Sequence, residues 1–138
     1  MTYVSEAVDL FNNGYVCSQA VFATFAEDLG LKKEQALKIG ACFGSGMRKG
    51  EVCGACSGAL MALGLKYGNS KPEANEVCER FLDEFEKENG SYICNDLLNC
   101  DIATKEGVEY AVENNLFNEF CPKMVESAAE IAAKILFE

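Results

Sequence analysis

The chain has 138 residues, of which 49% are hydrophobic, and it carries a formal net charge of -10. This length is sufficient for a buried core, and we expect residues 1–138 to form a single domain. The negative charge argues against binding to nucleic acid or to an anionic membrane surface. The first residues show neither the basic nor the apolar region of a secretory signal, so we expect a cytoplasmic protein.

The cysteine and histidine counts restrict the chemistry further. There are eight cysteines and no histidine, which excludes Ser-His-Asp and Cys-His catalysis as well as imidazole metal ligands. A reducing cytoplasm does not favour four structural disulfides. Metal binding, thiol redox chemistry and simple core packing therefore remain as roles for the cysteines.

Apolar residues recur at steps of three and four along most of the chain, which is the spacing of amphipathic helices. The predicted helices cover residues 3–12, 17–30, 33–42, 52–67, 70–90 and 104–114, with a short segment at 94–98 and a last helix that begins at Cys121. No stretch alternates with period two for long enough to form a strand. We therefore predict an all-α fold, a compact bundle of roughly five to seven helices around a central helix of small residues.

The stretch from Phe43 to Gly64 contains this central helix. It begins with a Gly-Ser-Gly turn and the basic residues Arg48 and Lys49, and it continues as an apolar run from Val52 to Leu65. Such a run is shorter than the roughly 20 apolar residues that cross a bilayer, so it indicates a buried helix. Its glycines weaken an isolated helix, and they indicate close approach by neighbouring helices or by a bound group.

Four cysteines share one sequence property, because each lies where a loop leads into a predicted helix. They are Cys17, Cys53, Cys94 and Cys121. Pro122 favours the first helical position, which makes Cys121 the expected N-cap of the last helix. Free backbone N–H groups and the helix dipole stabilise a thiolate at such a place and lower its pKa. Four such helix starts, if they converge, form a pocket suited to an anionic, sulfur-ligated centre.

The other four cysteines carry weaker signals. Cys78 continues the apolar stripe of its helix, which is typical of a passive core residue. Cys42 and Cys100 also fit core packing better than chemistry. Cys56 lies one turn beyond Cys53, and the sequence leaves its role open between packing and chemistry.

Taken together, the motifs resemble the C-GCAxxG-C-C family, a group of proteins of about this length with an ascribed redox role. The resemblance covers nearly the whole chain. It rests on Tyr15–Val21, the glycine turn after Phe43, Gly50–Ala55 with Gly58–Leu60 as the CGAxxG signature, Cys94 with Leu97 and Leu98, Leu116 with Phe117, and Cys121 with Pro122. The chain departs from the family pattern in its four additional cysteines.

The resemblance implies a redox role, the same four helix-start cysteines as the characteristic ones, and an iron–sulfur cluster. Our first hypothesis is a protein that binds this cluster through four thiolates and transfers electrons. Gly44 and Gly46 are expected to line the site, and Arg48 and Lys49 are candidates to offset its negative charge. The expected partner is an unidentified redox protein, with no nucleic acid and no membrane insertion, whereas a homodimer and an enzymatic activity are left open.

Three other hypotheses remain at this point. Cys56 falls on a variable position of the signature and forms a C-x-x-C pair with Cys53, which would supply a nucleophilic and a resolving thiol for disulfide chemistry. The four cysteines could instead form a structural zinc site without catalysis, although zinc ligands usually come in closely spaced pairs. The last hypothesis is a metal-free helical domain that binds a partner.

Overall fold

The structure is a computed structural model that describes residues 2–138, so that Met1 of the expected domain lies outside it. Within the described residues the chain forms eight α-helices and no β-strand, which confirms the all-α prediction. The helices are α1 (Tyr3–Asn12), α2 (Cys17–Ala26), α3 (Lys33–Ile39), α4 (Gly54–Tyr67), α5 (Lys71–Asn89), α6 (Cys94–Leu98), α7 (Lys105–Glu113) and α8 (Cys121–Phe137). The count exceeds the expected range because the short segment at 94–98 forms a helix of its own.

Helix ends follow from local chemistry. The hydroxyls of Thr2, Ser70 and Thr104 each accept a backbone N–H in the first turn of α1, α5 and α7, which satisfies one of the donors that a helix start leaves free. Gly90 ends α5 in a left-handed conformation that favours glycine. The predicted second helix divides into α2 and a short 3₁₀ turn that Gly30 ends.

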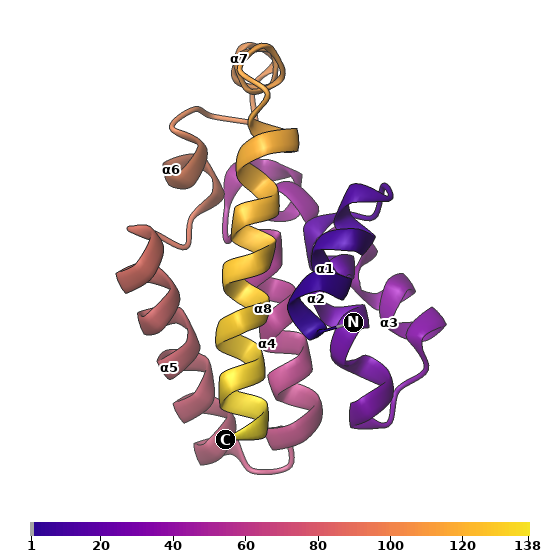
Figure 1. Ribbon diagram of the computed structural model, residues 1–138. Coiled ribbons are helices and arrows are strands. Elements are labelled where there is room, and N and C mark those ends of the chain that lie inside the picture. Colours follow the sequence, from indigo (N-terminus) through magenta and orange to yellow (C-terminus); the bar gives the residue numbers. More distant parts are fainter. Residues whose placement is uncertain (1) are drawn as a thin grey trace.

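Helices α4 and α8 run side by side through the middle of the molecule (Figure 1). Helix α5 packs against both of them on one side, while α1 and α2 pack on the other side and α3 packs outside α2. Helices α6 and α7 lie at the end of the bundle where α8 begins (Figure 1). The expectation of a central small-residue helix is confirmed, because α4 contacts α2, α5 and α8.

The main core forms between these helices, and α4 contributes small buried side chains such as Ala55, Ala59 and Ala62 to it. Glycine at position 58 has a direct packing reason. A Cβ atom added to Gly58 would lie 2.5 Å from the carbonyl oxygen of Ser18 and 3.2 Å from the backbone nitrogen of Phe22. Helices α2 and α4 therefore touch backbone to backbone at this point.

A second, smaller hydrophobic cluster lies beside the main core and consists of Cys94, Leu98, Ile102 and Ala111. Phe120 packs against both clusters, so it connects the segment that contains α6 and α7 to the bundle. The junction of the two clusters is the part of the fold that positions the site described below.

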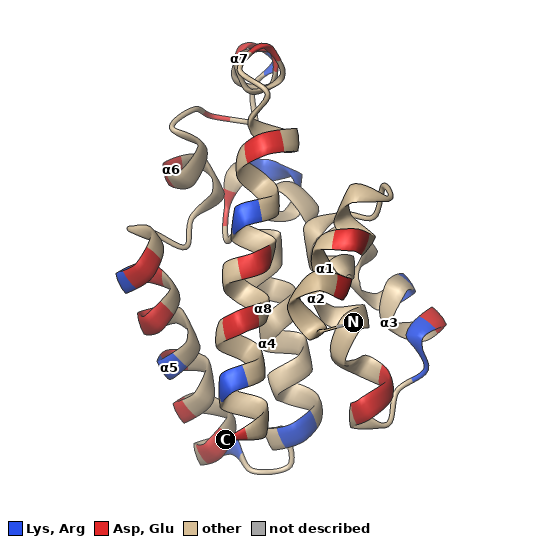
Figure 2. Cartoon of the chain, viewed as in Figure 1, with Lys and Arg blue, Asp and Glu red and all other residues tan. Residues whose placement is uncertain are grey.

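Charged residues are spread over the outer faces of the helices, with many acidic positions on α5 and α8 (Figure 2). The C-terminus is held by an ion pair in which Arg80 Nη1 lies 2.6 Å from Glu138 Oε1. Among residues 2–138, no helix has the length and apolar character that crossing a membrane requires.

The contact at Gly58 yields a stability prediction. Gly58→Ala should lower the free energy of unfolding by about 1–3 kcal/mol, because the added methyl group meets the α2 backbone, which cannot rotate away. The measurement is urea or thermal unfolding followed by circular dichroism.

Gly64 supplies the matched control on the same helix. In the described part of the chain, nothing lies within 4 Å of a Cβ added there. Gly64→Ala should therefore leave stability unchanged or raise it by up to about 1 kcal/mol through helix propensity. Equal effects of the two substitutions would contradict the packing account.

Candidate functional site

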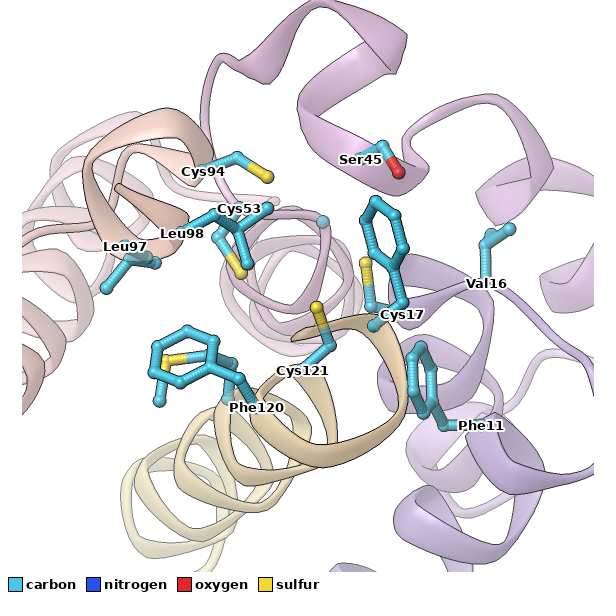
Figure 3. A pocket seen from close by; sticks show the side chains of 13 residues that line it. Phe11, Val16, Cys17, Ser45, Cys53, Cys94, Leu97, Leu98, Phe120 and Cys121 are labelled. Atoms are coloured by element: carbon cyan, nitrogen blue, oxygen red, sulfur yellow. The ribbon is translucent and has the colours of Figure 1, made fainter. Parts of the chain in front are cut away.

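The structure brings the four helix-start cysteines together at one end of the bundle. Cys53 is the N-cap of α4, whereas Cys17, Cys94 and Cys121 are the first residues of α2, α6 and α8. All four line one cavity of about 90 Å³. Figure 3 shows their sulfur atoms around a common space between the helix starts. Residues that are up to 104 positions apart in sequence (Cys17 and Cys121) thus share one site.

A short backbone bridge places Cys53 next to Cys94. Val52 and Ile93 pair in antiparallel orientation. The Cys53 N–H donates to the Tyr92 carbonyl at 2.8 Å, and the Cys94 N–H donates to the Glu51 carbonyl at 2.6 Å. Sequence reasoning missed this bridge, because one residue pair produces no alternating pattern.

Gly54 allows Cys17 to reach the site. A Cβ atom added to Gly54 would lie 2.3 Å from Cys17 Sγ and 2.8 Å from the Phe43 carbonyl oxygen. The CGAxxG signature therefore contains two glycines with a defined steric role, since Gly58 admits the α2 backbone and Gly54 admits the Cys17 sulfur.

The Gly-Ser-Gly turn meets the cavity through its serine. Ser45 lines the cavity, whereas Gly44 and Gly46 are not among the described residues of its wall. A Cβ on Gly44 would lie 2.7 Å from the Val16 Cβ, and one on Gly46 would lie 2.4 Å from the Glu51 nitrogen. Both glycines are buried against neighbouring protein, and the expectation that they line the site of a bound group stays a prediction.

The backbone after Gly44 is left-handed over several residues. Ser45, Met47 and Arg48 have φ values of 54°, 59° and 65°. Such conformations cost on the order of 1 kcal/mol or more per non-glycine residue and are concentrated at functional sites. The Gly-Ser-Gly motif signals a turn, but neither Met47 nor Arg48 is a residue type from which a left-handed backbone could be predicted.

The remainder of the cavity wall is apolar. It is formed by Phe11, Val16, Gly54, Leu97, Leu98, Phe117, Phe120 and Met124. Among residues 2–138, the side chains that line the cavity offer four thiols and one hydroxyl as their polar groups. An apolar wall lowers the local dielectric constant, which strengthens electrostatic interactions beside it.

The pKa values of the thiols differ from the prediction at three of the four positions. Burial raises the pKa of Cys17 and Cys94, and it raises that of Cys121 to about 12, with added repulsion from other thiolates of the site. Cys53 behaves as expected, because a hydrogen bond from the Cys56 thiol and N–H groups of Ala55 and Cys56 lower its pKa. Desolvation exceeds the effect of the helix start at the other three sites.

Cys121 also differs from its predicted local role. The N-cap of α8 is Phe120, whose φ of -92° and ψ of -48° are already close to helical values. The turn over Leu116–Phe120 therefore leads directly into the helix. Cys121 consequently lies inside the first turn of α8 and not at its N-cap.

The additional cysteines lie outside the described cavity wall. Cys56 is fully buried beneath Cys53, and its thiol donates the hydrogen bond to the Cys53 sulfur. Cys78 lies on α5 beside a separate groove that includes Leu60 and Leu63, where it is half-buried as a packing residue. Cys42 is exposed, and Cys100 is half-buried against the smaller cluster.

The four thiols of the cavity limit which kind of metal centre the site could bind. Within residues 2–138, no three Cys, Asp or Glu side chains are arranged so that they could hold a metal ion. A zinc ion requires its sulfurs about 2.3 Å away around one point, whereas these thiols surround a cavity. Four cysteines on an apolar wall are the donor set that iron–sulfur clusters use, and a cluster occupies more space than one ion. The residues present therefore fit a cluster in their chemistry.

Comparison with known proteins gives one match. The model of the family described as "Putative redox-active protein (C_GCAxxG_C_C)" matches residues 15–135. Neither the curated proteins nor the solved structures gave a match to the chain. The matched range includes all four cysteines of the cavity.

The different pKa shifts yield a prediction for the reduced, metal-free protein. A lowered pKa means that the reactive thiolate is populated at lower pH, so alkylation of Cys53 by iodoacetamide should rise at a lower pH than alkylation of free cysteine. Cys121 should react only at higher pH. Mass spectrometry of peptides from a pH series measures each position separately.

Cys56→Ala is the matched control, because it removes the first cause of the lowered Cys53 pKa. In this variant the Cys53 profile should move to higher pH. A Cys53 profile at or above that of free cysteine in the parent protein would contradict the assignment.

Proposed function

The chain belongs to the family described as "Putative redox-active protein (C_GCAxxG_C_C)", and we propose that it binds an iron–sulfur cluster through Cys17, Cys53, Cys94 and Cys121 and transfers electrons. The observation that carries the proposal is the convergence of these four thiols on one cavity. The bound cluster would supply one-electron chemistry that the amino-acid side chains of the site lack.

The chain's own groups would support the cluster in three ways. Four thiols provide a complete ligand set without histidine, which the chain does not contain. Backbone N–H groups of Ser45 and Ser18 face the Cys17 sulfur, and those of Ala55 and Cys56 face the Cys53 sulfur. These donors stabilise negative charge on the ligands. Phe117 and Phe120 contribute to the apolar wall that would keep water from the site.

The raised thiol pKa values are compatible with this role. A metal centre binds the deprotonated thiol, and its positive charge offsets the cost of ionising a buried cysteine. Cys53 would provide the first thiolate, because its pKa is lowered in the metal-free chain. Metal uptake should consequently release protons and become weaker as the pH falls.

Anaerobic reconstitution tests the proposal. The purified, reduced chain is incubated with iron and sulfide, and the product is desalted and analysed for iron, sulfide and visible absorption. We expect a brown species with charge-transfer bands that bleach on reduction. Cys53→Ser and Cys121→Ser should lose the colour, because each removes one of the four thiolate ligands.

Cys78→Ala is the control variant, because its thiol lies at a separate groove and should be dispensable for iron and colour. A wild-type chain that takes up no iron would refute the proposal. Full colour in both ligand variants, or loss of colour in Cys78→Ala, would show that the ligand set is misassigned.

A second function is favoured by the position of Cys56, which lies one turn beyond Cys53 in α4 and whose thiol is the largest cause of the lowered Cys53 pKa. In thiol–disulfide exchange, the Cys53 thiolate would attack a substrate disulfide and form a mixed disulfide while one substrate thiolate leaves. Cys56 would then attack the Cys53 sulfur, give its proton to the departing second thiolate, and leave a Cys53–Cys56 disulfide. The substrate disulfide is thereby reduced by two electrons and the pair is oxidised.

Cys56→Ser separates the two functions. It should keep iron and colour if the four cavity thiols bind a cluster, since Cys56 is not among the described wall residues. It should abolish the reduction of a small disulfide if the C-x-x-C pair is the functional one.

A further inference from the structure

Ser45 combines two features that are difficult to explain by packing alone. It provides the hydroxyl on a cavity wall whose other described polar side chains are thiols. Figure 3 shows it on the same part of the wall as Cys17. The place that a Cβ on Gly54 would occupy lies 2.3 Å from Cys17 Sγ and 3.2 Å from Gly44 Cα, so the turn that carries Ser45 adjoins the Cys17 sulfur. Burial is the largest influence on the Cys17 pKa and raises it, whereas the Ser45 N–H acts in the opposite direction.

The backbone at Ser45 is unfavourable for a serine. Its φ of 54° and ψ of 39° are left-handed, a region that glycine adopts without a steric cost. Glycine stands on either side of it at Gly44 and Gly46, yet the position that faces the cavity carries a side chain. A residue that is kept in a costly conformation at a site is a reason to look for a role of its side chain.

The neighbouring contacts hold this conformation. The Glu51 N–H donates to the Gly46 carbonyl at 3.1 Å, and the Met47 N–H donates to the Phe43 carbonyl at 3.4 Å. Gly44 packs against Val16, which is a residue of the cavity wall. The turn is thus held from both ends, and it presents the Ser45 side chain to the cavity.

We propose that Ser45 is a positioning residue of the site, which orients Cys17 through its N–H and donates a hydrogen bond from its hydroxyl to the sulfur of the group bound in the cavity. The proposal rests on the proposed cluster. Hydrogen bonds to cluster and ligand sulfurs stabilise the more negative, reduced state and raise the reduction potential. Ser45 would therefore set the potential of the centre rather than bind metal itself.

Three substitutions separate the hydroxyl from the backbone conformation. Ser45→Ala removes the hydroxyl and keeps the conformational cost. Ser45→Gly removes the hydroxyl and also relieves that cost. Ser45→Thr keeps the hydroxyl, but its branched side chain is disfavoured in the left-handed region.

The experiment compares the midpoint potential of each anaerobically reconstituted variant with the melting temperature of its metal-free form. Ser45→Ala and Ser45→Gly should both shift the potential to lower values, and Ser45→Thr should keep it near that of the wild type. Melting temperatures should follow a different order, with Ser45→Gly highest and Ser45→Thr lowest. Potential and stability would then vary independently, which a purely structural role of Ser45 does not produce.

The outcomes also distinguish this proposal from the one on which it rests. If the wild type takes up iron and both Ser45→Ala and Ser45→Gly keep its potential, the Ser45 role is wrong and the cluster assignment stands. A wild type that takes up no iron overturns both. Should Ser45→Ala fail to assemble, Ser45→Gly still decides the matter, because its backbone is relaxed at this position.

Discussion

The site depends on the close contact between the start of α4 and helix α2, which requires the absence of side chains at Gly54 and Gly58. At Gly58 the α2 backbone occupies the place of a Cβ atom, and at Gly54 the Cys17 sulfur does so. A methyl group at either position would push α2 outward and move Cys17 away from Cys53. The two glycines of the CGAxxG signature thus fix the distance between the first two cysteines of the cavity.

The second constraint is electrostatic. Four thiols lie around an apolar cavity, and burial raises the pKa of three of them. Ionising several buried thiols that repel one another as thiolates is unfavourable in the metal-free chain. It becomes favourable when a positively charged centre binds the thiolates. Cys53 differs from the others through its hydrogen-bond donors. This difference links the two candidate functions, since the same thiolate would start metal binding or disulfide exchange.

Much of the architecture could be predicted from local patterns. Periodic apolar residues located the long helices, and loop-to-helix junctions located Cys17, Cys53, Cys94 and Cys121. The features that the sequence did not predict depend on tertiary contacts. The Val52–Ile93 bridge involves a single residue pair, and the left-handed turn at Ser45 packs through Gly44 against Val16, which is distant in sequence. The raised pKa values likewise reflect burial, which helix position alone does not reveal.

The central claim is that these four cysteines hold one sulfur-ligated centre. It is tested most directly by diffraction from anaerobically loaded crystals at the iron absorption edge, because anomalous scattering locates iron without assumptions about its ligands. The account predicts a compact anomalous peak inside the cavity, bounded by the sulfurs of Cys17, Cys53, Cys94 and Cys121. Iron bound elsewhere on the chain, or a cavity free of anomalous density in protein that contains iron, would contradict it.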